Sequence, residues 1–340
     1  MPGSKSSGNV SAVNAAALSC LVFSILPGAS ARADDASIEE LVVQGKYLSL
    51  DKINAVKTPT PIIDVPQSLT ILSEQQIEDQ AFQSVGDVLR YTPGLAVSQG
   101  EGHRDAIIIR GIQTTADFFV DGVRDDVQYY RPLYNVQQVE VLRGANALLF
   151  GRGGGGGIVN RVQKKPVLGQ QFTTVDAGID TFGAWTTTAD VNVATGDRMA
   201  FRLNAYAQGL DNHRDFFDGD GFAVNPTFKV ELGPATSGFV SYEYLEDDRV
   251  VDRGVPSRAV ADAPNEPLDG FDDTFFGSPA ENATSLEAHL LRARVDHTFS
   301  DALRGNLTVQ YADYDKVYQN LYPSDAVVVS GGLIPAGELD

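Results

Sequence analysis

The chain has 340 residues, of which 43% are hydrophobic and 21% charged, with a formal net charge of −19 and one cysteine. This composition excludes a disordered chain, a collagen and a disulfide scaffold. No run of about 18 apolar residues occurs, so no membrane-spanning helix is expected. The negative charge argues against a nucleic-acid partner, because phosphates repel carboxylates.

The first 33 residues have the pattern of an export signal. Residues 12–26 are mostly apolar, Lys5 precedes them, and Ala31-Arg32-Ala33 follows with the small-residue pattern of a cleavage site. We therefore expect residues 1–33 to be a cleaved signal peptide, with a buried N-terminal helix as the alternative. Cys20 lies inside this segment, so the mature chain would contain no cysteine and no disulfide.

Residues 62–166 predict a compact α+β unit. Ser73-Glu74-Gln75-Gln76 follows a short strand at 67–72 and fits a capping box, with Ser73 as the helix N-cap and Gln76 reaching back. Ser84 opens a second helix, which Pro93-Gly94 would end. Apolar runs bounded by turn residues predict further strands at 106–110, 118–120, 139–143 and 158–162.

From residue 167 to 340 the hydrophobic pattern changes to a period of two, as where Phe201 and Leu203 alternate with Arg202 and Asn204. It predicts seven strands at about 171–179, 183–195, 198–210, 221–232, 237–248, 286–299 and 303–318. Tight turns alternate with longer connections, up to the 37 residues of 249–285. Long alternating strands joined in this way are typical of an outer-membrane β-barrel. A soluble β-sandwich is the alternative.

Six motifs of the α+β unit follow one another in a characteristic order. They are Asp64-Val65-Pro66-Gln67-Ser68, Asp87-Val88-Leu89-Arg90-Tyr91-Thr92-Pro93-Gly94, Ile109-Arg110-Gly111, Phe119-Val120-Asp121-Gly122-Val123-Arg124, Val139-Glu140-Val141-Leu142-Arg143-Gly144 and Leu149-Phe150-Gly151-Arg152-Gly153. Together they resemble the plug domain of TonB-dependent outer-membrane receptors, in the siderophore branch. The resemblance implies an α+β plug domain followed by antiparallel transmembrane β-barrel strands.

The predicted barrel is incomplete. Bacterial single-chain barrels have an even number of strands, and a plug of about 100 residues needs a barrel of about 22 strands. Seven strands of an expected 22 would make this chain the N-terminal part of a longer protein. Edge strands without partners are costly in lipid, so we expect these 340 residues alone neither to insert nor to transport.

A short apolar segment at 38–45 precedes the plug, within a linker region at 34–61. Its residues Glu39, Glu40, Leu41, Val42 and Val43 resemble a TonB box. An extended segment of this kind can add as a strand to the sheet edge of a partner. An ordinary N-terminal strand is the alternative.

The resemblance also implies where a ligand would bind. The plug loops at 97–105 and 124–134 offer a set of polar and aromatic side chains, namely Gln99, His103, Arg104, Tyr129, Tyr130 and Arg131. Arginine can pair with an anionic aromatic iron complex, and tyrosine can stack on it. The alternative is that these side chains only pack against barrel loops. Arg110 and Arg143 are expected to hold the plug through barrel-wall carboxylates.

The predicted function is TonB-dependent uptake of a ferric siderophore, catecholate rather than hydroxamate, across the outer membrane of a Gram-negative bacterium. Its expected partners are the ferric siderophore, TonB with its inner-membrane energising proteins, and outer-membrane lipid. No enzymatic site and no resident cofactor or metal are expected, since iron is carried within the ligand. The alternatives are another scarce ligand (haem, cobalamin or a sugar) and a soluble secreted β-rich binding module.

Overall fold

The computed structural model describes residues 52–53, 60–61, 68–98, 100–125, 127–144, 150, 156–259 and 264–323. The predicted signal peptide, the TonB-box segment and Gln99 lie outside these described residues. Two short strands, β1 (Lys52–Ile53) and β2 (Thr60–Pro61), pair in antiparallel fashion. Among the described helices, none is long and apolar enough to cross a membrane.

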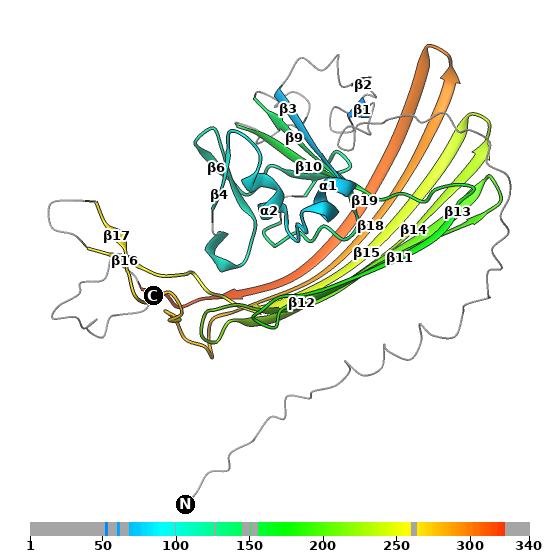
Figure 1. Ribbon diagram of the computed structural model, residues 1–340. Helices are drawn as coiled ribbons and strands as arrows, with labels where there is room; N and C mark the ends of the chain where they lie inside the picture. Colours follow the sequence, from blue (N-terminus) through cyan, green and yellow to red (C-terminus); the bar gives the residue numbers. More distant parts are fainter. Residues whose placement is uncertain are drawn as a thin grey trace, which may run out of the picture. The chain divides into compact units, whose positions relative to one another are not determined.

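A five-stranded sheet forms the centre of the α+β unit, with the order β3-β9-β10-β7-β8 (Figure 1). Its strands are β3 (Ser68–Ser73), β7 (Phe118–Val120), β8 (Val123–Arg124), β9 (Val136–Arg143) and β10 (Gly157–Gln163). β9 pairs in antiparallel fashion with β3 and β10, and β7 lies parallel to β10. Every residue of β10 is buried, which explains its apolar run. The four strands predicted in this sheet are confirmed, whereas β8 was not predicted.

Two short helices follow β3, each opened by a serine. Ser73 caps α1 (Glu74–Asp79), and its Oγ accepts a hydrogen bond of 3.3 Å from the Gln76 amide. Ser84 caps α2 (Val85–Arg90), and the Asp87 carboxylate reaches back to the Ser84 amide at 3.1 Å. Both N-caps predicted from the sequence are therefore confirmed. The capping box predicted at Ser73 has only its serine half, whereas Ser84 and Asp87 form a full capping box.

A three-stranded sheet lies next along the chain, with the order β4-β5-β6. It consists of β4 (Leu95–Ser98), β5 (Ala106–Ile109) and β6 (Ile112–Thr114), of which only β5 was predicted. Apolar side chains of α2, β5 and β9 pack into one core cluster whose innermost members are fully buried: Val85, Val88, Leu89, Ile107, Ile109, Val139 and Val141. This cluster joins both small sheets and α2 into one unit.

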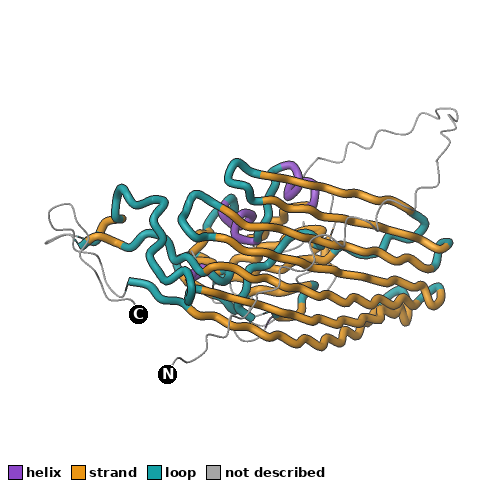
Figure 2. Tube along the Cα trace, turned by 90° about the horizontal axis from the view of Figure 1, so that it is seen from below, coloured by secondary structure: helices purple, strands orange, loops and turns teal. Residues whose placement is uncertain are grey.

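Seven long antiparallel strands form a single curved sheet, visible from two sides in Figures 1 and 2. They are β11 (Gln171–Ile179), β12 (Trp185–Thr195), β13 (Met199–Asp211), β14 (Asp218–Gly233), β15 (Thr236–Val250), β18 (Ala283–Ser300) and β19 (Leu303–Gln319). All seven predicted strands are confirmed. The long connection after β15 carries a small hairpin of β16 (Ser257–Arg258) and β17 (Glu266–Pro267).

The two faces of this sheet differ in polarity, as β13 shows. Arg202 and Asn204 are 6% and 0% exposed, whereas Met199 and Phe201 on the other face are each 41% exposed. The same exposed face carries Val193, Phe228, Val240, Leu291, Val295, Leu307, Val309 and Tyr311. A soluble β-sandwich would bury its apolar face and expose its polar face. The observed arrangement is the reverse, as in strands that line a polar lumen and face lipid.

Candidate functional site

A buried ionic cluster fixes the plug loop at 124–134; it is called the Asp125 cluster below. The carboxylate of Asp125 accepts hydrogen bonds from Arg131 Nε at 3.0 Å, Arg161 Nη2 at 2.6 Å and Tyr129 Oη at 2.8 Å. Asp105 accepts from the backbone amide of Arg131 at 2.9 Å. The cluster joins the loop to β10 through Arg161 and to the start of β5 through Asp105.

Arg131 is 0% exposed and has its donors occupied. Besides the two carboxylates, its guanidinium donates to the carbonyl oxygens of Asp125, Val127 and Tyr129 at 2.9, 2.6 and 3.0 Å. It also lies 4.1 Å from the ring centroid of Phe118. The side chain predicted to contact a ligand is thus enclosed within the loop in this structure.

Opposite charges in the Asp125 cluster stabilise the ionised forms of their partners. Burial would raise the pKa of Asp125, but Arg131, Arg161 and the Tyr129 hydroxyl together hold it below its usual value. Burial dominates at Asp105 and raises its pKa despite Arg131. It likewise raises the pKa of the Tyr129 hydroxyl, with Asp125 adding to the effect. Tyr129 is therefore a hydrogen-bond donor at neutral pH.

His103 contacts the seven-stranded sheet instead of solvent. Lys316 of β19 lies 2.8 Å from its Nδ1 and donates to its carbonyl at 3.2 Å, and the Tyr318 ring lies 3.8 Å from the imidazole centroid. Burial, then Lys316 and Arg104, lower the pKa of His103 to about 3. The imidazole is consequently neutral, with Nδ1 as the acceptor for Lys316.

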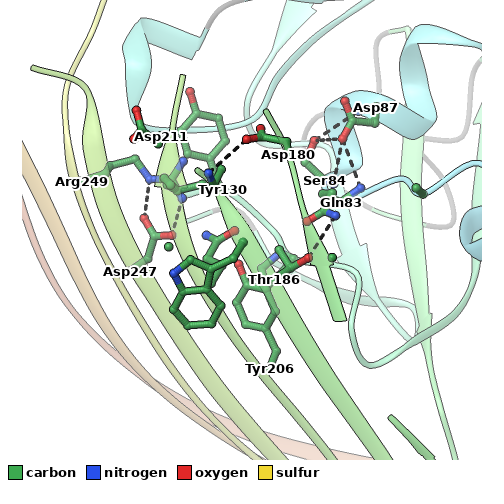
Figure 3. Close-up of a pocket in the computed structure, with 18 of the residues that line it drawn as sticks. Gln83, Ser84, Asp87, Tyr130, Asp180, Thr186, Tyr206, Asp211, Asp247 and Arg249 are labelled. Atoms are coloured by element: carbon green, nitrogen blue, oxygen red, sulfur yellow. Dashed lines mark hydrogen bonds and ion pairs between the residues drawn. The ribbon is translucent and has the colours of Figure 1, made fainter. Parts of the chain in front are cut away.

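Among the predicted ligand residues that the structure describes, Tyr130 and Arg104 retain exposed surface. Arg104 pairs with Glu101 at 2.8 Å and donates to Gln128. Tyr130 lies under Arg249 of β15, 4.4 Å from guanidinium carbon to ring centroid, and Arg249 pairs with Asp247 (Figure 3). Burial raises the pKa of Tyr130 to about 12, with Arg249 opposing the rise.

Tyr130 lines a cavity of about 540 Å³, called the loop-end cavity because it lies where β13 ends and β15 approaches the long connection. Gln83 reaches across it to Thr186 of β12, with Nε2 3.4 Å from Oγ1 (Figure 3). Its charged lining consists of four carboxylates and one guanidinium group: Asp87, Asp180, Asp211, Asp247 and Arg249. Arg131 also borders the cavity, but its guanidinium is enclosed. No cluster of His, Cys, Asp or Glu that could hold a metal occurs among the described residues.

Polar groups attach the α+β unit to the seven-stranded sheet at the sheet's buried face. Glu243 of β15 accepts from Tyr134 Oη, Asn135 Nδ2 and Gln163 Nε2 at 3.0, 3.0 and 3.1 Å. Arg292 of β18 donates from Nη1 to Asp121 Oδ2 and Gln163 Oε1, each at 2.9 Å. The turn after β7 and the end of β10 are thereby fastened to two wall strands.

A second attachment lies at β12 and β13. Lys164 pairs with Asp190 of β12 at 3.3 Å and with Glu74 of α1 at 2.8 Å. Arg202 of β13 pairs with Asp190 at 2.5 Å and donates to the Lys165 carbonyl at 3.0 Å. The last residues of the α+β unit are therefore bonded to the first strands that follow it in sequence.

Arg110 and Arg143 are placed differently from these attachments. Arg143 donates to Thr70 Oγ1 at 2.8 Å and to the Pro93 carbonyl, both within the α+β unit. Arg110 is exposed. Among the described residues neither arginine forms an ion pair with a wall carboxylate, so their predicted contact with the barrel wall stays a prediction.

The attachment residues found by the structure were missed by the sequence analysis. Asp121 belongs to a quoted motif, but nothing in that motif identifies Arg292 as its partner 171 positions away. Glu243 could have been singled out from the sequence, because it is a charged residue at an alternating position of a predicted strand. Its burial at 9% exposure could have been suspected from a polar lumen-facing pattern.

Comparison with known proteins gives consistent findings. A family model described as TonB-dependent Receptor Plug Domain matches residues 61–158. The chain is 29% identical over 311 residues to the probable TonB-dependent receptor BfrD of Bordetella pertussis, covering 88% of this chain and 41% of that one. It is 31% identical over 235 residues to the catecholate siderophore receptor Fiu of Escherichia coli, covering 67% and 30%.

A solved structure has the same fold. The crystal structure of the siderophore receptor PiuA from Acinetobacter baumannii aligns with a TM-score of 0.76 at 26% identity, over 83% of this chain and 41% of that chain. The chain thus spans about two fifths of the length of BfrD and of the PiuA structure.

Proposed function

Because the chain belongs to the TonB-dependent receptors, we propose that it serves the uptake of a ferric siderophore across the outer membrane of a Gram-negative bacterium. The observation that carries this proposal is the polarity of the seven-stranded sheet: its polar face is bonded to the plug, and its apolar face is exposed. Such a sheet suits a wall between lipid and a plugged lumen. The exposed apolar face does not favour the soluble binding module.

The ligand class follows from the relatives. PiuA is described as a siderophore receptor and Fiu as a catecholate siderophore receptor, which supports a siderophore here, catecholate in preference to hydroxamate. Among the five predicted ligand residues that the structure describes, Tyr130 has the best position, because it lines the loop-end cavity beside Arg249. An aromatic ring and a guanidinium can together contact a catecholate ring and its anionic oxygens. Haem, cobalamin and sugars are the competing ligands.

Energy for transport would come through TonB. Residues 38–45 lie ahead of the plug and carry the apolar sequence that suits strand addition to a partner's sheet edge. Capture of this segment would let the inner membrane supply work, since one elementary charge crossing 100 mV carries about 2.3 kcal/mol. The plug's hydrogen bonds to Glu243 and Arg292 are contacts that such work would have to break.

The test is uptake by cells that lack their own siderophore receptors. The full-length receptor is expressed, and labelled ferric complexes of a tris-catecholate and a tris-hydroxamate are supplied separately. We expect the catecholate complex to enter and the hydroxamate complex to remain outside. Entry of neither complex, with the receptor present in the outer membrane, would contradict the proposal and favour haem, cobalamin or a sugar.

A further inference from the structure

A second cavity lies between the plug and the wall, at the end of the sheet with the tight turns. It measures about 810 Å³ and is called the turn-end cavity. On the plug side it is lined by Asp121, Gly122 and Val123, and on the wall side by residues of β15, β18 and β19. Along β15, Phe239 of this cavity and Asp247 of the loop-end cavity are eight residues apart, about 27 Å of strand.

The charges of the two cavities differ in sign. The turn-end cavity has four basic side chains, Lys165, Arg292, Arg294 and Arg304, against three carboxylates, Asp121, Glu231 and Asp296. The loop-end cavity has four carboxylates against the single accessible guanidinium group of Arg249. A small surplus of positive charge inside walls of low dielectric concentrates anions. The turn-end cavity as a whole therefore attracts anions, whereas in the loop-end cavity Arg249 beside Tyr130 offers an anion a local contact.

The side chain of Arg292 is oriented by hydrogen bonds to another wall strand. Its Nε and Nη2 donate to Gln310 Oε1 of β19 at 3.0 and 2.7 Å, so its orientation does not depend on the plug alone. Its remaining nitrogen, Nη1, donates to Asp121 Oδ2. The Asp121 carboxylate also binds Lys165 Nζ at 3.1 Å. One plug carboxylate therefore neutralises two basic groups of this cavity.

Displacement of the turn at 121–122 would remove that carboxylate. Arg292 Nη1, which also donates to Gln163 Oε1, would then lose its charged acceptor and present a donor to an oxygen of an anion. Arg294, whose nearest acid is Asp296 at 2.6 Å, and Arg304 continue the basic surface along β18 and β19. Within the described part of the chain Arg304 forms no ion pair. Arg292, uncovered by this displacement, and Arg294 and Arg304, which the turn does not cover, lie on one continuous stretch of wall.

From this arrangement we infer that the turn-end cavity is an internal transit site for an oxygen-rich anionic ligand, and that Asp121 occupies the place of the ligand's anionic oxygens until the plug moves. The inference rests on the proposed function for the identity of the ligand. The ligand would pass along β15, β18 and β19. Arg292, Arg294 and Arg304 are the groups that would contact it during passage.

The charge of the cavity can be tested without any siderophore. A single cysteine is placed in the turn-end cavity as Asn306→Cys, in a full-length receptor from which any other cysteine of the mature chain has been removed. It is labelled with an anionic and a cationic thiol reagent of equal size. We expect the anionic reagent to react about fivefold faster than the cationic one. Arg294→Gln with Arg304→Gln leaves two basic groups against three carboxylates and should reverse this preference. Thr186→Cys in the loop-end cavity should likewise react faster with the cationic reagent. A preference for the cationic reagent at Asn306→Cys would overturn the inference.

Transport tests the passage itself. In the uptake assay with the ferric tris-catecholate, Arg294→Gln with Arg304→Gln should lower the initial rate about fivefold while surface binding changes by less than about twofold. The matched control is Arg198→Gln, which removes one positive charge near the same end of the sheet but outside the cavity. An unchanged rate would overturn the transit role. If the unmodified receptor imports no siderophore, the proposed function fails, and the labelling result still decides the charge of the site.

Discussion

Arg292 of β18 and Asp121 of the turn after β7 form an ion pair of 2.9 Å across 171 positions of sequence. Both side chains are shielded from solvent, at 6% and 11% exposure. Removing one partner of a shielded pair leaves the other charge without compensation, which costs more than the pair contributes. The attachment of the plug to the wall is therefore sensitive to single substitutions at this pair.

Asp121→Asn should loosen the plug turn. The amide keeps the shape of the side chain but removes the charge that faces Arg292 and Lys165, at an expected cost of about 1–3 kcal/mol. Hydrogen exchange of residues 118–124 in the full-length receptor should become correspondingly faster. Asp301→Asn, at the exposed turn between β18 and β19, is the control and should leave that exchange unchanged. Equal protection in Asp121→Asn and the unmodified protein would contradict this view of the pair.

Glu243 and Tyr134 should show a coupling energy. The Tyr134 hydroxyl donates to Glu243 at 3.0 Å, and both side chains are buried. A double-mutant cycle with Tyr134→Phe and Glu243→Gln should give a coupling of about 0.5–3 kcal/mol in the free energy of plug release. Tyr134→Phe with Asp296→Asn, which does not contact Tyr134, provides a reference cycle near zero. A Glu243–Tyr134 coupling no larger than this reference would show that the hydrogen bond is energetically irrelevant.

His103 should make the receptor's stability depend on pH. Its pKa is lowered to about 3 by burial and then by Lys316, whereas an unfolded histidine titrates near 6.5. Between these values the unfolded chain binds a proton that the folded chain does not. The stabilisation is therefore complete above about pH 6.5 and is lost as the pH falls toward 3.

The thermal midpoint of the detergent-solubilised receptor checks this prediction. His103→Gln should reduce the fall in midpoint between about pH 7.5 and about pH 5, because glutamine has no proton to bind in this range. His213→Gln, in an exposed loop, is the matched histidine control. An identical fall in His103→Gln and the unmodified receptor would rule out this histidine as the cause.

Tyr130 and Arg131 are adjacent but should respond differently to substitution. Arg131→Ala leaves Asp125 and Asp105 buried with fewer partners and should destabilise the loop by about 3–5 kcal/mol. Tyr130→Ala removes a ring from the edge of the loop-end cavity and should weaken ligand binding with little change in thermal midpoint. Binding isotherms and melting curves of the two variants distinguish these effects. A normal midpoint for Arg131→Ala would refute its structural role.

Much of the fold could be predicted from the sequence because its signals are local. The seven wall strands alternate over nine or more residues, so each can be recognised from its own sequence. Ser73 and Ser84 are helix caps that act within three residues. In contrast, β6 and β8 are three and two residues long, too short to show any period, and only their neighbours in the sheet stabilise them.

The site was harder to predict because its contacts are distant in sequence. Arg131 was predicted as a ligand residue because a guanidinium can pair with and stack on an anionic aromatic iron complex. Its burial depends on Asp105, Asp125 and Phe118, which the fold alone brings together. The pairing of Gln163 with Glu243 likewise spans 80 positions, and no local pattern records it.

Energised uptake of the ferric siderophore depends on the 38–45 segment in the proposed mechanism, and Val42→Pro tests this dependence. Proline removes the backbone donor needed for strand addition by the 38–45 segment, whereas Val42→Ala keeps it. In the full-length receptor, both variants should bind the labelled ferric siderophore at the cell surface, but only Val42→Ala should import it. Import by Val42→Pro at the rate of Val42→Ala would contradict the proposal that TonB captures this segment to drive transport.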